Sequence, residues 1–392
     1  MKTHKIWFIT ISIFIVGILL IIFLATQSIG KKLYSRKVME ETQMLVMEDM
    51  HSSPPEIAEI YAYVSTIYYN VLKNENSSQA AVVASTKFLN LIYPEQDQKY
   101  KIDKFLISLS IDPNYKLGTT TQEYLNQTLD TYTKNKENKY PYKRPLGKVY
   151  WSGESPLGID ILDRQPMLIK KDYLSTIPPP PAEGSQEQKD ALKELAYQTK
   201  IKSLEQGALI NYWSGMHMTP GTSGVWQNRF YNVVVNYRLS DEEYAKDQML
   251  LAQTIYDTYL EVWKIKYKYW TKRPSTYSKE ITLEMIDPNY PSYVSEYSAV
   301  SQSAYLLLST LFPDGKNIWS QDFENASRIG AWAGCSFPYD ETSGEELGQN
   351  IFNEINSNLK LNAIPYGYSF IPLKILTPKV LIYDRSEEAY KR

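Results

Sequence analysis

Lys266-Tyr-Lys-Tyr-Trp-Thr-Lys-Arg273-Pro274 is the first of three stretches that decide the fold of this 392-residue chain. The others are Pro291-Ser-Tyr-Val-Ser295-Glu296-Tyr297-Ser298 and Ser327-Arg328-Ile-Gly-Ala-Trp-Ala-Gly-Cys335-Ser336-Phe-Pro-Tyr-Asp340. Lys266 and Arg273 are two helical turns apart, so they share one face of a helix that the following proline ends. A solvated basic helix end is the simplest explanation of this stretch. Because a bound oxyanion needs several fixed cations, the three stretches together favour an anion pocket.

These stretches resemble the three signature motifs of the vanadium-dependent haloperoxidase and type-2 phosphatidic acid phosphatase superfamily. In that family, lysine and arginine hold phosphate or vanadate, and two histidines carry out the chemistry. The resemblance implies that Lys266, Arg273, Ser295 and Arg328 bind the anion, although Ser295 could equally be a plain helix N-cap. Segments from Ser53-Pro-Pro-Glu to Thr219-Pro-Gly also match in order, so the resemblance covers about residues 40–355. The implied fold is an all-α helical bundle.

The chain departs from the family at both histidines, which makes it a divergent member of the superfamily that it resembles. The histidine positions fall on Tyr297 and Ser336, the second in a register shifted by two extra residues. Asp340 matches the carboxylate that orients the second histidine. No catalytic residue is therefore assigned, and the chain is expected not to be an enzyme.

Glu296 replaces the family glycine that lies nearest the anion. Cations that converge without a counter-ion repel one another. We therefore expect the Glu296 carboxylate to turn inward, fill the pocket and pair with Arg273 or Arg328. Vanadate or phosphate is expected only if the pocket is open, and no other cofactor is expected.

Other side chains offer little replacement chemistry. Ser336 lacks an evident base, and a lone cysteine such as Cys335 is more often a small buried apolar residue. His4 and His51 lie near the N-terminal apolar stretch, and His217 lies on a loop where a surface or packing role fits better than catalysis. No pattern of metal ligands is present, so no metal site is predicted.

Residues 6–25 form a 20-residue stretch without a charge, with basic residues on both sides. A bilayer core of about 30 Å needs about 20 apolar residues. We therefore expect residues 1–30 to be an N-terminal transmembrane helix, with a cleaved signal peptide as the alternative. The habit of the family places the large domain outside the cytoplasm. The expected partners are the membrane and other proteins. Nucleic acid is not expected, because the net charge is −2.

Residues 31–392 form one predicted helical domain. Within it, residues 138–184 are rich in proline and predict a long irregular segment, and the tail at 360–392 is expected to be extended over 363–384. Helical patterns cover 57–72, 79–91, 99–110, 120–132, 186–213, 221–237, 240–272, 295–311, 322–334 and 343–358.

Three functions remain open at this point. The first is a membrane-anchored, catalytically degenerate protein with a structural or interaction role. The second is an active phosphatase or vanadium haloperoxidase that uses Tyr297, Ser336 or Cys335. The third is a non-catalytic phosphate or oxyanion binder.

Overall fold

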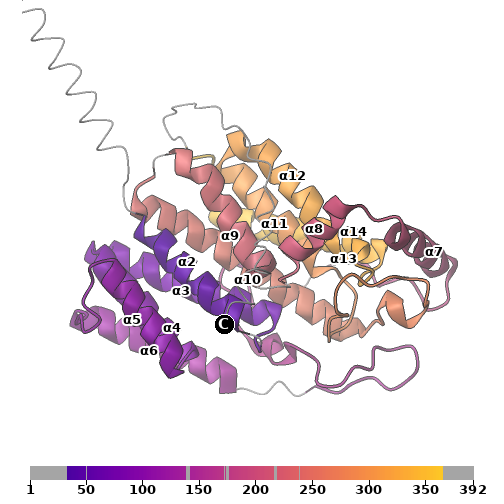
Figure 1. Cartoon of the computed structure of the whole chain (residues 1–392), viewed down its shortest axis with the longest axis horizontal. Helices are drawn as coiled ribbons and strands as arrows, with labels where there is room; N and C mark the ends of the chain where they lie inside the picture. Colours follow the sequence, from indigo (N-terminus) through magenta and orange to yellow (C-terminus); the bar gives the residue numbers. More distant parts are fainter. Residues whose placement is uncertain are drawn as a thin grey trace, which may run out of the picture.

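A computed structural model describes residues 33–49, 51–137, 142–171, 173, 176–215, 219–237 and 239–364 (Figure 1). Within these ranges the chain consists of α-helices and short 3-10 helices joined by irregular segments, without a β-strand. The prediction of an all-α fold is confirmed. No helix in the described ranges is long and apolar enough to cross a membrane. The predicted transmembrane helix at 6–25 and most of the tail lie outside the described residues.

The α-helices have the following bounds: α2 Tyr34–Glu48, α3 Pro54–Glu75, α4 Ser78–Ile92, α5 Gln96–Ser108, α6 Thr119–Glu137, α7 Gln186–Lys200, α8 Leu204–Trp213, α9 Gly221–Val234, α10 Asp241–Tyr269, α11 Glu296–Leu311, α12 Lys316–Ser327, α13 Ile329–Trp332 and α14 Pro338–Leu359. The 3-10 helices are η1 Ile159–Asp163, η2 Val235–Tyr237, η3 Pro274–Thr276 and η4 Pro313–Gly315.

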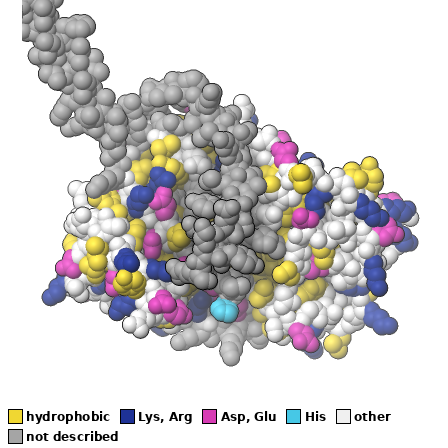
Figure 2. All heavy atoms as spheres, in the orientation of Figure 1, with side chains coloured by type: hydrophobic (Ala, Val, Ile, Leu, Met, Phe, Trp, Pro, Cys, Tyr) yellow, Lys and Arg dark blue, Asp and Glu magenta, His cyan; other side chains and the backbone are white. Residues whose placement is uncertain are grey.

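Charged side chains of both signs are interspersed over the face of the molecule that Figure 2 shows.

Helix α10 is the centre of the bundle, and most of its 29 residues are buried. It packs against α3, α11, α9, α2 and α14. A helix that is buried on all sides belongs in the core. It begins at the predicted capping box, in which the Ser240 hydroxyl accepts the N–H of Glu243 at 3.2 Å and the Glu243 carboxylate accepts the N–H of Ser240 at 2.8 Å. It ends at Tyr269, three residues before the predicted end.

Two neighbours of α10 carry the second and third stretches. Helix α11 runs antiparallel to α10, because Thr258 contacts Ser303 while Lys266 contacts the start of α11. Helix α14 packs closely on α11 through Gly344 and Gly348, where a Cβ atom would collide with the α11 backbone. These two glycines therefore fix how near the first turn of α14 lies to the first turn of α11.

Several predicted helix bounds are wrong. The predicted helix at 186–213 is two helices, because Ser203 starts α8 with a capping box that includes Gln206. The predicted helix at 322–334 is α12 followed by the short α13. Helix α14 begins at Pro338, five residues earlier than predicted, because proline fits the first turn of a helix. Helix α2 was not predicted.

Two buried carboxylates hold the proline-rich segment against the bundle. Residues 142–171 are irregular apart from η1. Asp257 of α10 accepts the backbone N–H groups of residues 167, 168 and 169 at 2.7, 2.7 and 3.0 Å. Glu59 of α3 forms a buried ion pair with Arg164. The segment therefore lies on α3 and α10 through specific polar contacts.

Candidate functional site

The three stretches meet where α10 ends and α11 and α14 begin. Lys266 lies in the last turn of α10, and Arg273 follows the end of that helix. Ser295 is the N-cap of α11 and Glu296 is its first residue. Asp340 lies in the first turn of α14. We call the buried group formed by Lys266, Arg273, Tyr290, Glu296 and Asp340 the ionic core.

The Lys266 ammonium is completely enclosed, with 0% exposure. It donates hydrogen bonds to the carbonyl oxygens of Pro291 at 3.2 Å, Ser292 at 2.7 Å and Val294 at 2.7 Å. An ammonium group has three N–H donors. All three are therefore taken by the backbone of residues 291–294. This burial excludes the solvated helix end as the role of Lys266.

The Glu296 side chain points inward and is only 1% exposed. Its Oε2 atom lies 2.9 Å from the Lys266 ammonium nitrogen, and its Oε1 atom accepts a hydrogen bond from the Tyr290 hydroxyl at 2.6 Å. The expectation of an inward carboxylate agrees with this placement. The expected arginine partner is wrong, because Glu296 forms its ion pair with Lys266, which lies in the last turn of α10.

Electrostatics keep this pair charged at neutral pH. Burial lowers the pKa of Lys266 to about 8, and the attraction of Glu296 opposes that shift. Burial would raise the pKa of Glu296, but Lys266 and Arg273 together hold it below its usual value. The pair therefore places one negative and one positive charge side by side in the protein interior.

Arg273 is also buried, at 2% exposure, and it binds the backbone of two segments. Its Nε donates to the carbonyl of Tyr290 at 2.9 Å and to that of Pro288 at 3.1 Å. Its Nη1 donates to the carbonyl of Cys335 at 2.8 Å, and its Nη2 to that of Pro291 at 3.4 Å. The guanidinium group therefore connects residues 288–291 with the loop before α14.

Asp340 and Ser295 make capping contacts. The Asp340 carboxylate accepts the Ser292 hydroxyl at 2.6 Å and the Phe337 N–H at 3.0 Å. Its burial raises its pKa to about 6. The Ser295 hydroxyl accepts the N–H of Ser298 at 3.4 Å and its hydroxyl at 3.1 Å. Both residues thus stabilise helix starts, which is the plain N-cap role considered for Ser295.

Arg328 lies apart from the ionic core. Its side chain is exposed at the junction of α12 and α13. Its charge acts to lower the pKa of Glu341 and Glu345 of α14, against the stronger effect of their burial. We predicted from the sequence that Arg328 lies with Lys266 and Arg273, but in the structure it lies apart from them. The third stretch carries two extra residues after Arg328, which is where its register departs from the family pattern.

The residues at the family histidine positions are buried and poorly suited to proton transfer. Burial raises the pKa of Tyr297 well above its usual value, and its hydroxyl lies 4.0 Å from the Met285 sulfur. Ser336 is buried beside Cys335. Burial raises the pKa of the Cys335 thiol to about 12. His51 is exposed, and His4 and His217 lie outside the described residues.

We expect Cys335 to be unreactive in the folded protein. A thiol needs to ionise before it attacks an electrophile, and burial both hinders ionisation and excludes the reagent. Ellman's reagent at pH 8 should release little thiolate dye from native protein and one equivalent after unfolding in guanidinium chloride. Rapid reaction of the native protein would contradict the placement of Cys335.

The fold family implies vanadate or phosphate at this position, and the described side chains do not fit such an anion as arranged. The three donors of Lys266 and each nitrogen of Arg273 already have carbonyl acceptors. The Glu296 carboxylate lies beside them and would repel an oxyanion. Among the described residues, no group of three His, Cys, Asp or Glu side chains could hold a metal ion.

Tyr290 was missed by the sequence analysis. Its hydroxyl binds Glu296, and its ring lies against both cations, 5.2 Å from Lys266 and 4.8 Å from Arg273. The carbonyls of residues 288–294 were also missed. A backbone acceptor has no signature in the sequence, and a tyrosine beside two prolines gives no signal of burial.

Comparison with known proteins identifies the fold. The chain resembles a bacterial vanadium-dependent iodoperoxidase with a TM-score of 0.66 and 15% identity, over 84% of this chain and 96% of that one. It also resembles a bacterial vanadium-dependent chloroperoxidase in its holo form, with a TM-score of 0.60 and 12% identity over 78% of this chain and 92% of that one. The apo form gives a TM-score of 0.59 at 12% identity, over 79% of this chain and 97% of that one.

No family model and no curated protein matches the sequence. The predicted resemblance to the vanadium-dependent haloperoxidases is confirmed at the level of the fold by these structures. This chain has the fold of the vanadium-dependent haloperoxidases.

Proposed function

We propose that this chain is a membrane-anchored protein in which the oxyanion site of the haloperoxidase fold has become a closed ionic core. It acts in a structural or interaction role and not as an enzyme. The observation that carries the proposal is the buried contact of 2.9 Å between Lys266 and Glu296. In this proposal the Glu296 carboxylate is the counter-ion of the buried cations, in place of the vanadate or phosphate that the fold family binds.

The hydrogen bonding of the two cations supports a structural role. Buried charges persist in proteins when they are paired and hydrogen-bonded. Lys266 and Arg273 bind the carbonyls of residues 288–294, so they stabilise the loop that connects η3 to α11. While the Glu296 carboxylate lies beside these donors, it repels a substrate phosphoryl group from them.

The chemistry of the remaining side chains also supports the absence of catalysis. An active phosphatase or haloperoxidase would need a nucleophile or a proton donor that titrates near neutral pH. The pKa of Tyr297 lies well above its usual value, and that of Cys335 is about 12. Asp340 has a pKa of about 6, but it is completely enclosed and caps a helix through Ser292 and Phe337. A non-catalytic oxyanion binder would need free donors at the same place.

We therefore expect no hydrolysis of aryl phosphates and no vanadate-supported oxidation of bromide above background by the purified full chain. General acid–base catalysis alone contributes about 10²–10⁴-fold in rate. Installing Tyr297→His and Ser336→His together should restore little activity while Glu296 fills the site, and adding Glu296→Gly should be needed for any gain.

Two controls make this test decisive. Lys279→Ala changes an exposed lysine and controls for the effect of a substitution as such, and Lys266→Met removes a buried cation of the ionic core. The activity of a contaminating enzyme would survive both substitutions. Robust turnover by the unmodified chain that survives Lys279→Ala and is lost in a folded Lys266→Met variant would establish the active-enzyme alternative.

We further propose that the large domain lies outside the cytoplasm and is tethered to the membrane by residues 6–25. The length and lack of charge of that stretch support the tether. Protein partners would then meet the domain on surfaces away from the membrane.

A further inference from the structure

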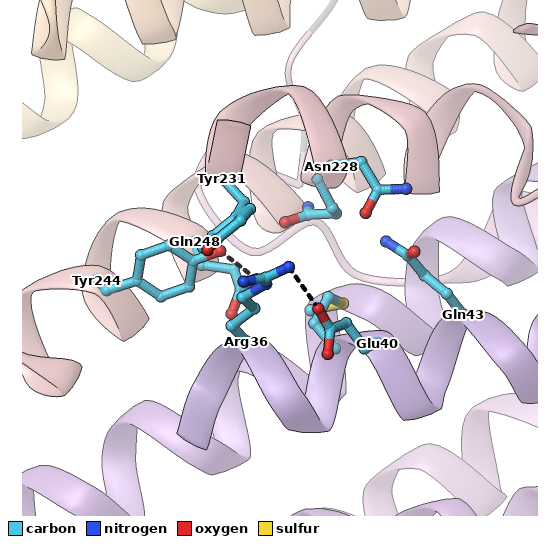
Figure 3. A pocket seen from close by; sticks show the side chains of 9 residues that line it. Arg36, Glu40, Gln43, Asn228, Tyr231, Tyr244 and Gln248 are labelled. Atoms are coloured by element: carbon cyan, nitrogen blue, oxygen red, sulfur yellow. Dashed lines mark hydrogen bonds and ion pairs between the residues drawn. The ribbon is translucent and has the colours of Figure 1, made fainter. Parts of the chain in front are cut away.

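A small pocket lies where α2, α9 and the first turns of α10 meet (Figure 3). It measures about 10 Å³, room for about one water molecule, and it is open to solvent on one side. Polar side chains dominate its lining, and they are Arg36, Glu40, Gln43, Gln227, Asn228 and Gln248. From Gln248 to Lys266, α10 rises about 27 Å at 1.5 Å per residue. The pocket is therefore distinct from the ionic core.

The carboxamide of Gln227 in this pocket is buried and unsatisfied. Gln227 is 2% exposed, and neither its Oε1 nor its Nε2 has a hydrogen-bond partner among the described residues. By contrast, Gln43 donates to the carbonyl of Gly224 at 3.2 Å, and Gln248 donates to the Tyr244 hydroxyl at 3.4 Å. Because a buried polar group without a hydrogen bond costs free energy, native proteins rarely leave one. The Gln227 amide therefore indicates a bound group that satisfies both of its polar atoms.

The size of the pocket and the chemistry of the amide together select a hydroxyl group. An ammonium only donates hydrogen bonds and a carboxylate only accepts them, so each would leave one polar atom of Gln227 unpaired. A hydroxyl donates one hydrogen bond and accepts others, and its oxygen is the size of a water molecule. It reproduces the bonds of a water in this space, which is the condition for displacing an ordered water without loss of affinity.

The pocket is bordered by a donor and an acceptor of opposite charge. Arg36 and Glu40 of α2 form an ion pair at 2.7 Å, and their side chains are 31% and 36% exposed. The Arg36 guanidinium lies 3.2 Å from the centre of the Tyr231 ring, so it is held between that ring and Glu40 (Figure 3). The two charges balance, which favours a neutral ligand. Neighbouring hydroxyls of one ligand can accept from the guanidinium and donate to the carboxylate.

We propose that the pocket between α2, α9 and α10 binds a neutral saccharide, with one hydroxyl in the pocket on the Gln227 amide and neighbouring hydroxyls on Arg36 and Glu40. The ligand is a free sugar or one sugar unit of a glycan, since both present the same hydroxyls. This site goes beyond the structural or interaction role proposed above. It depends neither on the closed ionic core nor on the tether at 6–25, so its failure would leave both of them standing.

The test is saturation-transfer NMR on the full chain in a detergent without a sugar headgroup, with D-glucose, D-mannose and D-galactose at millimolar concentrations. We expect transfer to at least one of these sugars. Glucosamine and glucuronate carry a charge and should bind more weakly than glucose. The methyl glycoside of the bound sugar distinguishes the two sources. It keeps the affinity if the ligand is a unit within a glycan and loses it if the anomeric hydroxyl of a free sugar enters the pocket.

Two variants connect the binding to this pocket. Gln227→Leu removes the donor and the acceptor at similar volume and should weaken sugar binding about tenfold or more. Glu40→Gln changes a partly exposed side chain and leaves the Arg36 charge unbalanced. It should weaken glucose binding several-fold and shift the preference toward glucuronate. Gln186→Leu, at an exposed position of α7, is the matched control and should bind like the wild type. Circular dichroism confirms that each variant is folded.

Three results would overturn the proposal. Absence of transfer to every sugar would mean that the pocket holds water alone. Equal binding by the wild type and a folded Gln227→Leu variant would place the sugar elsewhere on the protein. Tighter binding of a charged sugar than of glucose by the wild type would contradict the neutral ligand. If Gln227→Leu does not fold, unchanged affinity and unchanged preference in Glu40→Gln would overturn the proposal in its place.

Discussion

Replacing Glu296 with alanine should lower the free energy of unfolding of the full chain by about 3–5 kcal/mol, because one partner of a buried ion pair is lost. The change leaves the Lys266 ammonium enclosed without a carboxylate and removes the acceptor of the Tyr290 hydroxyl. The pKa of Lys266 is already lowered to about 8 by burial while Glu296 is present. Urea denaturation in detergent, followed by tryptophan fluorescence, measures the loss.

An exposed ion pair provides the matched control. Glu280 lies 3.1 Å from Lys200, with both side chains largely exposed. Because exposed pairs contribute little, Glu280→Ala should leave the denaturation midpoint almost unchanged. A Glu296→Ala variant as stable as Glu280→Ala would contradict the ionic core.

Phosphate should stabilise Glu296→Ala more than the wild type. Only the variant has lost the internal carboxylate, and a ligand that binds the native state alone raises its stability. Chloride at the same ionic strength separates binding from screening. Equal stabilisation of both proteins by phosphate would mean that Glu296 does not occupy the anion position.

The second large effect concerns Asp257, whose pKa is raised from 3.8 to about 7 because burial outweighs three backbone hydrogen bonds. Between pH 3.8 and 7 the unfolded chain releases a proton that the folded chain keeps. The folded state binds more protons in this window, so its stability falls as the pH rises. At about 1.4 kcal/mol per pKa unit, the full loss is about 4 kcal/mol.

Asp257→Asn should remove this slope. The difference in unfolding free energy between wild type and variant should shift by about 4 kcal/mol in favour of the variant from pH 4 to pH 7.5. Measuring the difference cancels the other titrating groups that both proteins share. Asp190→Asn, at an exposed position of α7, should follow the wild-type profile. Parallel curves for wild type and Asp257→Asn would contradict the assignment.

The fold was predictable because its signals are local and ordered along the chain. The capping box at Ser240 located the start of the central helix, the proline after Arg273 located its end to within three residues, and the three stretches indicated the family likeness. The break at residues 201–203 was missed because helical periodicity continues on both sides of it. The capping box at Ser203 was the signal that could have located that break.

The site was predictable only in part. Lys266, Arg273 and Glu296 were grouped correctly, but the predicted shared helix face is wrong, because α10 ends at Tyr269 and Arg273 lies beyond it. The choice between Lys266 and the arginines as the partner of Glu296 depends on the path of residues 288–294. Sequence spacing does not determine that path. Arg328 was misplaced because its stretch departs from the family register.

The most direct test of the closed ionic core is an isothermal titration of the purified full chain with orthovanadate, beside Glu296→Ala. We expect no saturable heat for the wild type, because the donors of Lys266 and Arg273 are bound to carbonyls and Glu296 repels the anion. Stoichiometric binding by the wild type that is lost in a folded Arg273→Lys variant would contradict it.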